Sequence, residues 1–340
     1  MSVFVDDIRG QGDALRELIA HRGEIAAALS RLDLRSFDRI VLSGMGGSHA
    51  AAYPAWLKLV GDGLPAWWVE TSELLPLADR LISPRTLLWL TSQSGESAEV
   101  VELLRALPAD GRPTVVGLTN TPSSTLGPVA EVVVELHAGA EHAVSTRTFV
   151  NTLGAFALAF AAPMVDPVAH SLDGTAAALD LWLESLDSAV GRAGALLAEA
   201  QSLIVVGRGA SLAAARAGAL TIKEAAKIHA EALSGGEFRH GPIELAAANI
   251  AIVILAGDER AAVFNRDLAA DLFAIGARTL WVGESPPAGI ESLPVPADGD
   301  DVSRSVAEIV ALQVCSLALA RRDGIEPGVF RFAAKVTTVQ

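Results

Sequence analysis

The chain has 340 residues, of which 51% are hydrophobic and 19% are charged, and its formal net charge is −14 at pH 7. A chain of this size and composition can bury a large core, and its length favours two domains or one large domain. Because the net charge is strongly negative and no basic run occurs, nucleic acid is excluded as an expected partner. A small anionic substrate stays compatible with the sequence, since a few local donors can hold it.

The sequence predicts a cytoplasmic protein that neither enters nor crosses a membrane. Its first residues contain no charged segment followed by an apolar one, which excludes a typical secretory leader. The longest uncharged helix-like run, at 151–165, is shorter than a bilayer-spanning helix requires. Cys315, the single cysteine, stands in an apolar run and is expected to be buried and unreactive, which fits a reducing compartment.

The predicted elements alternate between strands and helices along the chain. The first strand covers 38–42 and leads into the glycine-rich turn GMGGS at 44–48, which an alanine-rich helix follows. Further apolar runs typical of strands occur at 86–92, 113–119, 131–136, 202–206, 250–256, 278–284 and 291–297. Amphipathic patterns such as SAEVVELLRAL and AAVFNRDLAADLF separate these runs and predict helices. Strands and helices that alternate at this spacing indicate parallel βαβ crossovers.

An internal repeat relates the two halves of the chain. A shift of 163 residues places the turn Gly44–Ser48 on Gly207–Ser211, and each turn lies between a short apolar strand and an alanine-rich helix. The repeat predicts an α/β fold of two tandem domains, each with a parallel sheet flanked by helices. The predicted segments are a helical segment at 1–35, a first domain at 36–165, a helical bridge at 166–200, a second domain at 201–322 and a tail at 323–340.

The first domain carries a candidate anion-binding loop. In TSQSGESAE at 91–99, four hydroxyl side chains and an amide stand directly before a predicted helix, whose amino end favours a phosphate. The matching segment LAGDERAAV at 255–263 lacks the hydroxyls and gains Asp258 and Glu259, which would repel an anion. The alternative for the serine-rich loop is an ordinary serine N-cap with a nearby glutamate. Neither glycine turn has the spacing G-x-G-x-x-G, so we set nucleotide binding aside.

Four segments carry a family resemblance. They are TSQSGESAEVVELL, GAEHAVSTRTF at 139–149, KEAAKIHAEALSGGEFRHGP at 223–242 and the ending AAKVTTVQ. Together and in this order they resemble the sugar isomerase (SIS) family, and more narrowly the isomerase half of glucosamine-6-phosphate synthase and its stand-alone relatives. The resemblance implies two flavodoxin-like SIS domains of αβα sandwich type, a homodimer, and a sugar phosphate held by the first domain.

The resemblance also implies a set of binding residues. Those for the phosphate are Gly47, Ser48, Ser92, Gln93, Ser94 and Ser97, and those near the sugar are Ala143, Ser145 and Ala334. The turn GMGGSHA aligns with its family counterpart in more than one register, so either Gly47 or Ser48 can face the phosphate.

Moving a carbonyl between two carbons of a phosphorylated sugar requires a base, a ring-opening group and stabilisation of the developing charge. By resemblance the base is Glu224, and the ring-opening group is His240, which the partner subunit contributes to a shared active site. Lys335 matches the lysine that forms a Schiff base or steadies the carbonyl. The patterns alone also allow a surface Glu224 paired with Lys227, a His240 packed at a Gly-Pro turn and a solvated Lys335.

Three further polar residues, His229, Glu231 and Glu237, belong to the same block and are expected to be supporting or helix-terminal groups. Their spacing with His240 matches no metal-site pattern, so we expect no metal, and we expect no cofactor.

The chain departs from the synthase in three respects. It contains no glutamine-hydrolysing domain with an N-terminal cysteine, so we expect that glutamine is not its nitrogen source. Thr221 replaces an active-site lysine of the synthase, so the proton transfers are expected to differ. Gly328 and Phe330 stand where stand-alone relatives commonly have an acid and a proline, so we expect a different loop before Lys335.

Three functions remain open. The first is an isomerase or deaminase of an aminosugar 6-phosphate, which would convert glucosamine 6-phosphate to fructose 6-phosphate and ammonia. The second is a deglycase of phosphorylated Amadori compounds (fructosamine 6-phosphates), a branch that the segment GGEFRHGPIEL with Glu244 resembles. The third is a sugar-phosphate sensor without catalysis, which commonly adds a DNA-binding module or loses the glutamate and histidine. The sequence does not determine the stereochemistry of the sugar or the direction of the reaction.

Overall fold

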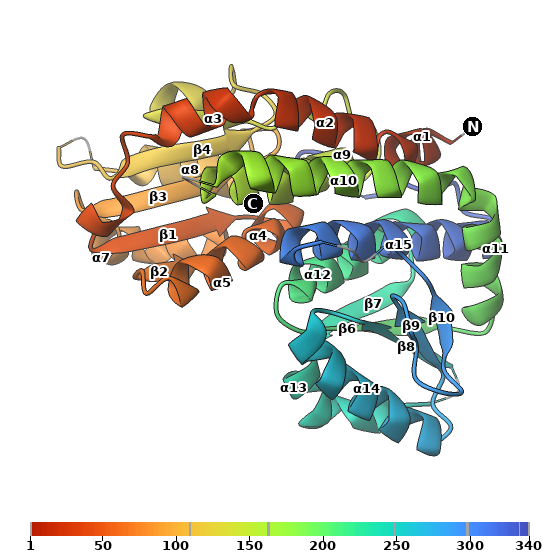
Figure 1. Ribbon diagram of the computed structural model, residues 1–340. Helices are drawn as coiled ribbons and strands as arrows, with labels where there is room; N and C mark the ends of the chain where they lie inside the picture. Colours follow the sequence, from red (N-terminus) through yellow and green to blue (C-terminus); the bar gives the residue numbers. More distant parts are fainter. Residues whose placement is uncertain are drawn as a thin grey trace. The chain divides into compact units, whose positions relative to one another are not determined.

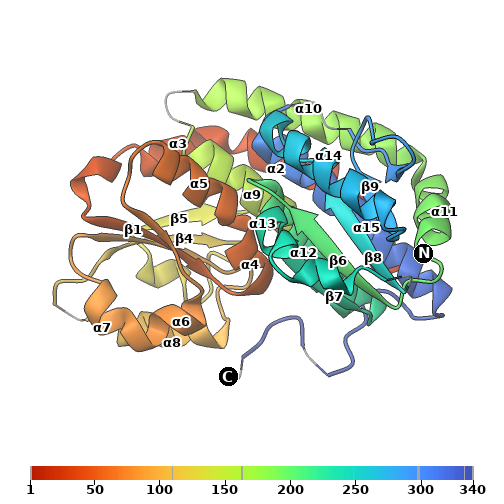
Figure 2. The same cartoon turned by 90° about the horizontal axis from the view of Figure 1, so that it is seen from below.

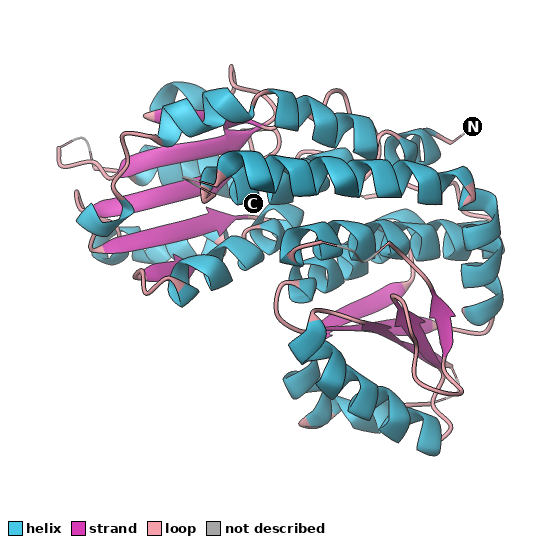
Figure 3. Cartoon of the chain, viewed as in Figure 1, coloured by secondary structure: helices cyan, strands magenta, loops and turns pink. Residues whose placement is uncertain are grey.

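The computed structural model describes residues 2–108, 110–161, 164–247, 249–296, 299–332 and 334–338, which form two parallel sheets flanked by helices (Figure 1, Figure 3). This architecture confirms the predicted α/β fold class, whereas the predicted domain boundaries stay a prediction. The chain divides into two compact units, which we call the first unit and the second unit. The first unit comprises Asp13–Glu141, Arg147–Leu172 and Phe332–Gln340, and the second comprises Met1–Gly12, His142–Thr146 and Asp173–Arg331.

The sheet of the first unit has the strand order β2-β1-β3-β4-β5, and all neighbouring strands are parallel. Its strands are β1 (Arg39–Gly44), β2 (Ala66–Trp68), β3 (Thr86–Thr91), β4 (Thr114–Thr119) and β5 (Val132–Glu135). Its helices are α3 (Arg22–Leu29), α4 (Gly46–Ala51), α5 (Tyr53–Gly61), α6 (Thr71–Leu74), α7 (Ala78–Leu81), α8 (Ala98–Ala106) and α9 (Arg147–Ala159), with short turns η1 (Leu34–Ser36), η2 (Leu75–Leu77) and η3 (Gly127–Val129). Two helices, α2 (Gln11–Ala20) and α10 (Val165–Glu184), contain residues of both units.

Helices cover both faces of this sheet. Figure 2 shows α6, α7 and α8 on one face and α3 and α5 on the other. On α8, Val100, Leu103 and Leu104 recur at helical spacing and are buried against Leu88 and Leu90 of β3. Every residue of β3 is buried, as expected of a central strand of a parallel sheet. Burial of each such leucine or valine stabilises the fold by roughly 1.5–3 kcal/mol.

The sheet of the second unit has the strand order β10-β9-β8-β6-β7 and is also parallel throughout. Its strands are β6 (Ser202–Gly207), β7 (His229–Ser234), β8 (Ile250–Leu255), β9 (Thr279–Val282) and β10 (Glu291–Leu293). Its helices are α1 (Val3–Arg9), α11 (Leu186–Leu196), α12 (Ser211–Thr221), α13 (Gly235–Arg239), α14 (Glu259–Ala274) and α15 (Asp301–Arg322), with the π-helical turn η4 (Ile222–Ala226) and the short turn η5 (Pro242–Leu245). The core includes Ile252 and Ile254 of β8 and Trp281 of β9.

The eight strands predicted from apolar runs are all confirmed, and two further strands, β2 and β7, were not predicted. Both are edge strands, which have fewer buried positions than the central ones. In β2, three residues suffice to pair with β1, and Trp67 in its middle is exposed. In β7, polar residues such as His229 and Glu231 are exposed and alternate with less exposed ones. The apolar-run signal is therefore weak at both edges.

Helix α15 is the one helix among the described residues that is long and apolar enough to cross a membrane, by length and composition alone. However, 89% of its apolar window is buried within the fold, as in a core helix. It packs on α12, where a side chain at Gly218 would lie 2.2 Å from Leu312. Cys315 of α15 is fully buried, and burial raises the pKa of its thiol to about 12. The expectation of a buried cysteine is confirmed.

The two glycine turns repeat each other in geometry as well as in sequence. A Cβ atom on Gly44 would lie 2.7 Å from the carbonyl oxygen of Thr91 and 3.2 Å from the amide nitrogen of His49. A Cβ atom on the equivalent Gly207 would lie 2.8 Å from the carbonyl oxygen of Ser211. Two residues later, Gly46 (φ 49°) and Gly209 (φ 55°) both adopt the left-handed conformation that glycine tolerates best. Each turn thus brings the start of the next helix close to the end of its strand.

A buried carboxylate lies beside the second glycine turn. Glu308 of α15 is only 1% exposed and accepts a hydrogen bond of 3.1 Å from the amide of Gly257, directly after β8. Burial raises the pKa of Glu308 to about 7, although hydrogen bonds from Ser211 and Gly257 and the charge of Arg304 oppose the rise. Asp301, on the same helix, adds a small further increase to the pKa.

Replacing Glu308 with glutamine should change how stability depends on pH. Because the folded-state pKa of Glu308 lies above its unfolded value, the stability that its proton provides is present below about pH 4.5 and is lost as pH rises through about 7. Glu308→Gln should therefore be more stable than the wild type at pH 8, by up to about 3 kcal/mol, and similar to it at pH 5. Urea unfolding at both pH values measures this difference. An equal stability difference at pH 5 and pH 8 would contradict it.

Candidate functional site

The predicted phosphate loop, residues 92–97, forms a compact turn between β3 and α8. The Ser92 hydroxyl accepts a hydrogen bond of 3.1 Å from the amide of Gly95 and lies 3.2 Å from the Ser97 hydroxyl. The Ser94 hydroxyl accepts from the amide of Glu96 at 3.1 Å. Gly95 has a φ of 67°, which turns the chain back toward Ser92. Three of the predicted phosphate ligands are thus gathered in one turn.

The loop is also tied to the segment that follows β4. The carbonyl of Gln93 accepts from the amide of Asn120 at 3.0 Å. The carboxylate of Glu96 accepts from the amide and from the hydroxyl of Thr125, the latter at 2.8 Å. Two donors therefore compensate the one negative charge of the loop.

The first glycine turn lies at the same edge of the sheet as this loop. Strands β1 and β3 are parallel neighbours in which Gly44 pairs with Thr91, so both connections leave from the carboxyl ends of adjacent strands. Gly47 and Ser48 lie on α4, in the connection that follows β1. Both are partly buried, so exposure does not decide which of them faces a phosphate.

The alternative that Ser97 is an ordinary helix cap does not fit the geometry. Ser97 occupies the N-cap position of α8 with extended backbone, but its side chain makes no capping hydrogen bond within the described chain. Its hydroxyl instead lies at hydrogen-bond distance from Ser92. The first amide of α8, on Ala98, donates to the carbonyl of Thr337 at 3.0 Å. The loop hydroxyls are therefore not used to cap the helix.

The C-terminal tail is anchored to the first unit by a buried carboxylate. The ammonium of Lys335 lies 3.0 Å from Glu141, whose side chain is 1% exposed. Glu141 also accepts from the amide (3.1 Å) and the hydroxyl (2.8 Å) of Thr148, in the first turn of α9. Ala334, beside Lys335, is exposed. Residues 333, 339 and 340 of the predicted tail lie outside the described residues.

Ala143 and Ser145 belong to the second unit, where a buried aspartate holds their segment. Asp7 of α1 is 2% exposed and accepts from the amides of His142 and Ala143, each at 3.2 Å. Ala143 is buried and Ser145 is half-buried. A side chain at Gly328 would lie 2.8 Å from Ala143, and Gly328 has a φ of 81°, which accounts for glycine at this departure from the family pattern.

Glu224 lies on a π-helical turn rather than on the α-helix that the sequence predicts. Helix α12 ends at Thr221, and the π-helical turn η4 continues to Ala226 and stops at Lys227, whose φ is 60°. Such π-helical turns are frequent at functional sites. Glu224 is half-buried, and the ammonium of Lys227 donates to its main-chain carbonyl. Burial, together with the charge of Arg331, lowers the pKa of Lys227, while the charge of Glu224 opposes this.

His240 is exposed at the end of α13 and is followed by Gly241, whose φ is 132°. Glu237 closes a capping box with Ser234: its carboxylate accepts from the Ser234 amide at 2.7 Å, and its amide donates to the Ser234 hydroxyl at 3.2 Å. These hydrogen bonds lower the pKa of Glu237. Glu237 is thus the helix-terminal group that was expected, whereas His229 and Glu231 lie on strand β7.

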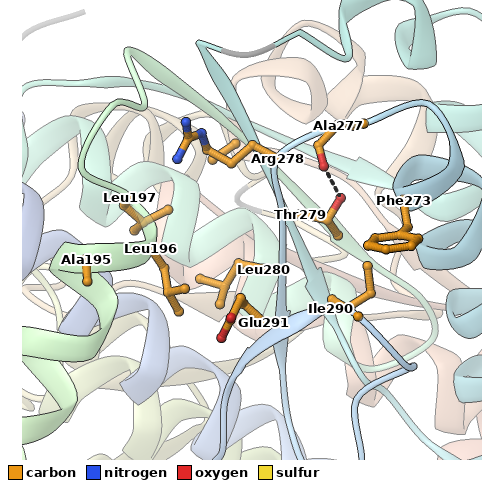
Figure 4. A pocket seen from close by; sticks show the side chains of 13 residues that line it. Ala195, Leu196, Leu197, Phe273, Ala277, Arg278, Thr279, Leu280, Ile290 and Glu291 are labelled. Carbon is orange, nitrogen blue, oxygen red and sulfur yellow. Dashed lines mark hydrogen bonds between the residues drawn. The ribbon is translucent and has the colours of Figure 1, made fainter.

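The second unit contains a cavity of 410 Å³, and none of these residues is among those that line it (Figure 4). Its lining includes Thr279 and Leu280 at the start of β9, so it lies at the amino ends of the strands. Arg278 at its rim is paired with Glu199. Ligands of open α/β sheets bind at the carboxyl ends of the strands, so we assign this cavity no role. The described residues contain no group of three or more metal-ligating side chains.

Comparison with known proteins identifies the family. A family model described as the SIS domain matches residues 33–162 and 196–279, which together make up more than half of the chain. The chain belongs to the SIS domain family. The two matched segments contain the two glycine turns, so the internal repeat corresponds to the two SIS segments.

Individual relatives agree with this assignment. Glutamine–fructose-6-phosphate aminotransferase (isomerizing) of Synechocystis sp. is 32% identical over 315 residues, which cover 86% of this chain and 50% of that protein. The chain thus spans about half the length of the curated relatives it matches. The C-terminal domain of glucosamine-fructose-6-phosphate aminotransferase from Francisella tularensis has a TM-score of 0.85 at 22% identity and covers 97% of this chain and 98% of its own.

A second solved structure, tagatose-6-phosphate ketose/aldose isomerase from Escherichia coli, has a TM-score of 0.81 at 20% identity and covers 96% of each chain. At such identities the two structures establish the SIS fold alone.

Replacing Gly95 with alanine should disrupt the predicted phosphate loop. The new Cβ would lie 1.8 Å from the Ser124 hydroxyl, and the left-handed backbone would add strain of roughly 1 kcal/mol. Gly63→Ala is the matched control, because Gly63 has a similar φ of 73° with no described atom near its would-be Cβ. Calorimetric titration with inorganic phosphate should show a loss of at least about tenfold in affinity for Gly95→Ala only. Equal affinities for the two variants would contradict the role of the loop.

Proposed function

We propose that the chain is an SIS-family phosphosugar isomerase or deaminase that acts on an aminosugar 6-phosphate such as glucosamine 6-phosphate. The observation that carries this proposal is the loop 92–97, which presents hydroxyls and amides at the carboxyl edge of a parallel sheet without using them to cap α8. An anion with several oxygens suits such a set of donors. We further propose that the protein is a cytoplasmic homodimer that binds no nucleic acid and no membrane.

The phosphate is held in this proposal by Ser92, Gln93, Ser94 and Ser97, together with Gly47 or Ser48. The preformed hydrogen bonds between Ser92, Gly95 and Ser97 support this assignment, because the loop needs little reorganisation before it binds. The amino end of α8 adds its partial positive charge. A fixed phosphate restricts where the sugar carbons can lie, which supplies part of the catalytic effect.

Glu224 is the proposed base. Its carboxylate takes a proton from C2 of the open-chain aldose, which gives an enediol or enolamine with its double bond between C1 and C2, and returns the proton to C1, so that the carbonyl or imine is left at C2. When the substrate carries an amino group at C2, the same intermediate leads to an imine, which water hydrolyses to ketose and ammonia. His240 is exposed on its own chain, which supports the proposal that it acts as a ring-opening group in the partner subunit.

Lys335 is the proposed electrophilic group. Its ammonium is held by Glu141 at 3.0 Å and can donate to the oxygen of the open-chain carbonyl. To form a Schiff base the amine must first lose a proton, and the carboxylate of Glu141 lies at the right distance to accept it. Glu141 is therefore a positioning residue for Lys335 in this proposal.

A deglycase of fructosamine 6-phosphates is the second candidate. Thr221, where the synthase has an active-site lysine, supports it, because its buried, uncharged side chain lacks the cation of that lysine. Glu244 lies exposed on η5, two residues after Pro242. Ala143, Ser145 and Ala334 would contact the sugar in either reaction.

Ammonia release from glucosamine 6-phosphate tests the first candidate. The wild type should release ammonia, and Glu224→Gln should lose at least about a hundredfold in rate, because general-base catalysis supplies roughly 10²–10⁴. Glu231→Gln, a nearby but exposed carboxylate on β7, should keep the rate. Sugar-phosphate binding should survive in both variants.

A parallel reaction with fructoselysine 6-phosphate distinguishes the alternatives. Lysine release without ammonia from glucosamine 6-phosphate would replace the deaminase with the deglycase. Binding without release of either product would favour another substrate or a sensor.

Glu141→Gln should weaken the action of Lys335 without affecting phosphate binding. Loss of the charged hydrogen bond, worth roughly 1.5 kcal/mol, should lower kcat by about tenfold while KM changes little. Borohydride trapping of a Schiff base with fructose 6-phosphate should fall in parallel and vanish in Lys335→Met. Glu131→Gln is the control, since Glu131 accepts from the Val115 amide at 2.6 Å, away from the tail. Full trapping and turnover in Glu141→Gln would refute this role.

A further inference from the structure

The second unit contains the counterpart of the phosphate site of the first unit. In the first sheet Ser43 of β1 pairs with Leu90 of β3, and in the second sheet Val206 of β6 pairs with Ile254 of β8. Ser43 and Val206 are equivalent in the repeat, so the connection after β8 corresponds to the loop 92–97. That connection, residues 256–258, is three residues long and reaches α14 without a serine.

A carboxylate from the same unit occupies this counterpart. Glu308 of α15 accepts from the amide of Gly257 at 3.1 Å, and the nearby Ser211 hydroxyl lowers the pKa of its carboxyl group. Gly257 lies in the counterpart of the phosphate loop, and Ser211 is the repeat equivalent of Ser48. The carboxyl group thus accepts from one of the two connections that, in the first unit, are assigned to the phosphate, and Ser211 of the other connection lowers its pKa.

The carboxyl group of Glu308 is enclosed by the second unit. The side chain is 1% exposed, and its second oxygen, Oε2, is buried with no hydrogen-bond partner among the described residues. The positive charge of Arg304 acts favourably on the carboxylate from the same helix, whereas Asp301 opposes it. A second carboxylate, Asp258, caps α14 through the Ala261 amide at 2.6 Å and lies near the glycine turn, 3.9 Å from the would-be Cβ of Gly209.

We propose that the carboxyl group of Glu308 fills the second SIS domain's phosphate site and closes it to phosphate esters. Amides and a hydroxyl at the amino ends of helices are costly to bury without an acceptor, and Glu308 supplies one permanently. A phosphate that entered would have to displace the carboxylate and lie beside Asp258. The chain therefore binds one sugar phosphate, at the first domain, and keeps a latent site for a phosphate group in the second.

This inference rests on one part of the proposed function, the assignment of the loop 92–97 to the phosphate. Its test measures phosphate binding and does not depend on turnover. Calorimetric titration with inorganic phosphate should give one site per chain for the wild type and no site for Gly95→Ala. In the Gly95→Ala background, Glu308→Ala should restore one site, because it removes the carboxylate and opens its space. Glu308→Gln is the matched control and should restore none, since the amide keeps the volume filled.

Adding Ser211→Ala should abolish the restored site. Adding Asp258→Ser should instead raise its affinity for phosphate, since serine still caps α14 but carries no negative charge. A folded Gly95→Ala/Glu308→Ala protein that binds no phosphate would overturn the proposal. If that variant does not fold, the Gly95→Ala protein decides the question. If the Gly95→Ala protein binds phosphate at a site that is lost on adding Ser211→Ala, the proposal is overturned. If the Gly95→Ala protein has no such site, the proposal is supported.

Discussion

The close approach between the end of the first strand and the start of the following helix determines where chemistry can occur in each unit. A Cβ atom on Gly207 would lie 2.8 Å from the carbonyl oxygen of Ser211 in the following helix. A Cβ atom on Gly44 would lie 3.2 Å from the amide nitrogen of His49 in its helix and 2.7 Å from the carbonyl oxygen of Thr91, so a larger residue at either position would force these segments apart. With glycine in place, the amides of the helix start lie at the carboxyl edge of a parallel sheet. There the connection from the neighbouring strand meets them, as at the ligand sites of other open α/β sheets.

The hydrogen-bond donors at this edge find their acceptors in different ways in the two units. In the first unit, hydroxyls of the loop 92–97 bond to one another and to a loop amide, an arrangement that an incoming phosphate can take over. In the second unit, the edge donors are held by Glu308 and the helix start by Asp258, both fixed parts of the chain. In the proposed function, the second unit uses another part of its sequence, the π-helical turn at Glu224, for proton transfer. A duplicated fold can in this way hold two different functions.

Much of this arrangement could be predicted from the sequence. Apolar runs bounded by glycine and polar residues predict all the central strands, and the 163-residue repeat predicts two sheets. Strand β7 escaped prediction because HAEALS consists largely of residues that also favour helices, and only pairing with β6 makes it a strand. The π-helical turn was not predicted for a similar reason. The segment IKEAA continues a helical pattern, and no glycine marks its end at Lys227.

The contacts that orient the candidate site were harder to predict, because they join distant parts of the chain. Lys335 and Glu141 are 194 residues apart, and neither has a neighbour in sequence that indicates the pair. Glu308 looks like one polar position on a long apolar helix, and only the fold places it beside Gly257. Asp7 gave a signal that could have been used, since an acid among the apolar residues of VFVDDIR is expected to have a buried partner.

The proposed function requires phosphate binding by the loop 92–97 and proton transfer by Glu224 in the same reaction. The most direct test is to incubate the protein in D₂O with glucosamine 6-phosphate and, separately, with fructose 6-phosphate, and to record the proton NMR spectrum of the sugar. The exchange of hydrogen for deuterium reports proton abstraction from carbon, whatever the final product. The account predicts deuterium at C1 or C2 with the wild type and none with Glu224→Gln or Gly95→Ala, of which only Gly95→Ala fails to bind phosphate. Undiminished deuterium incorporation by Glu224→Gln would contradict it.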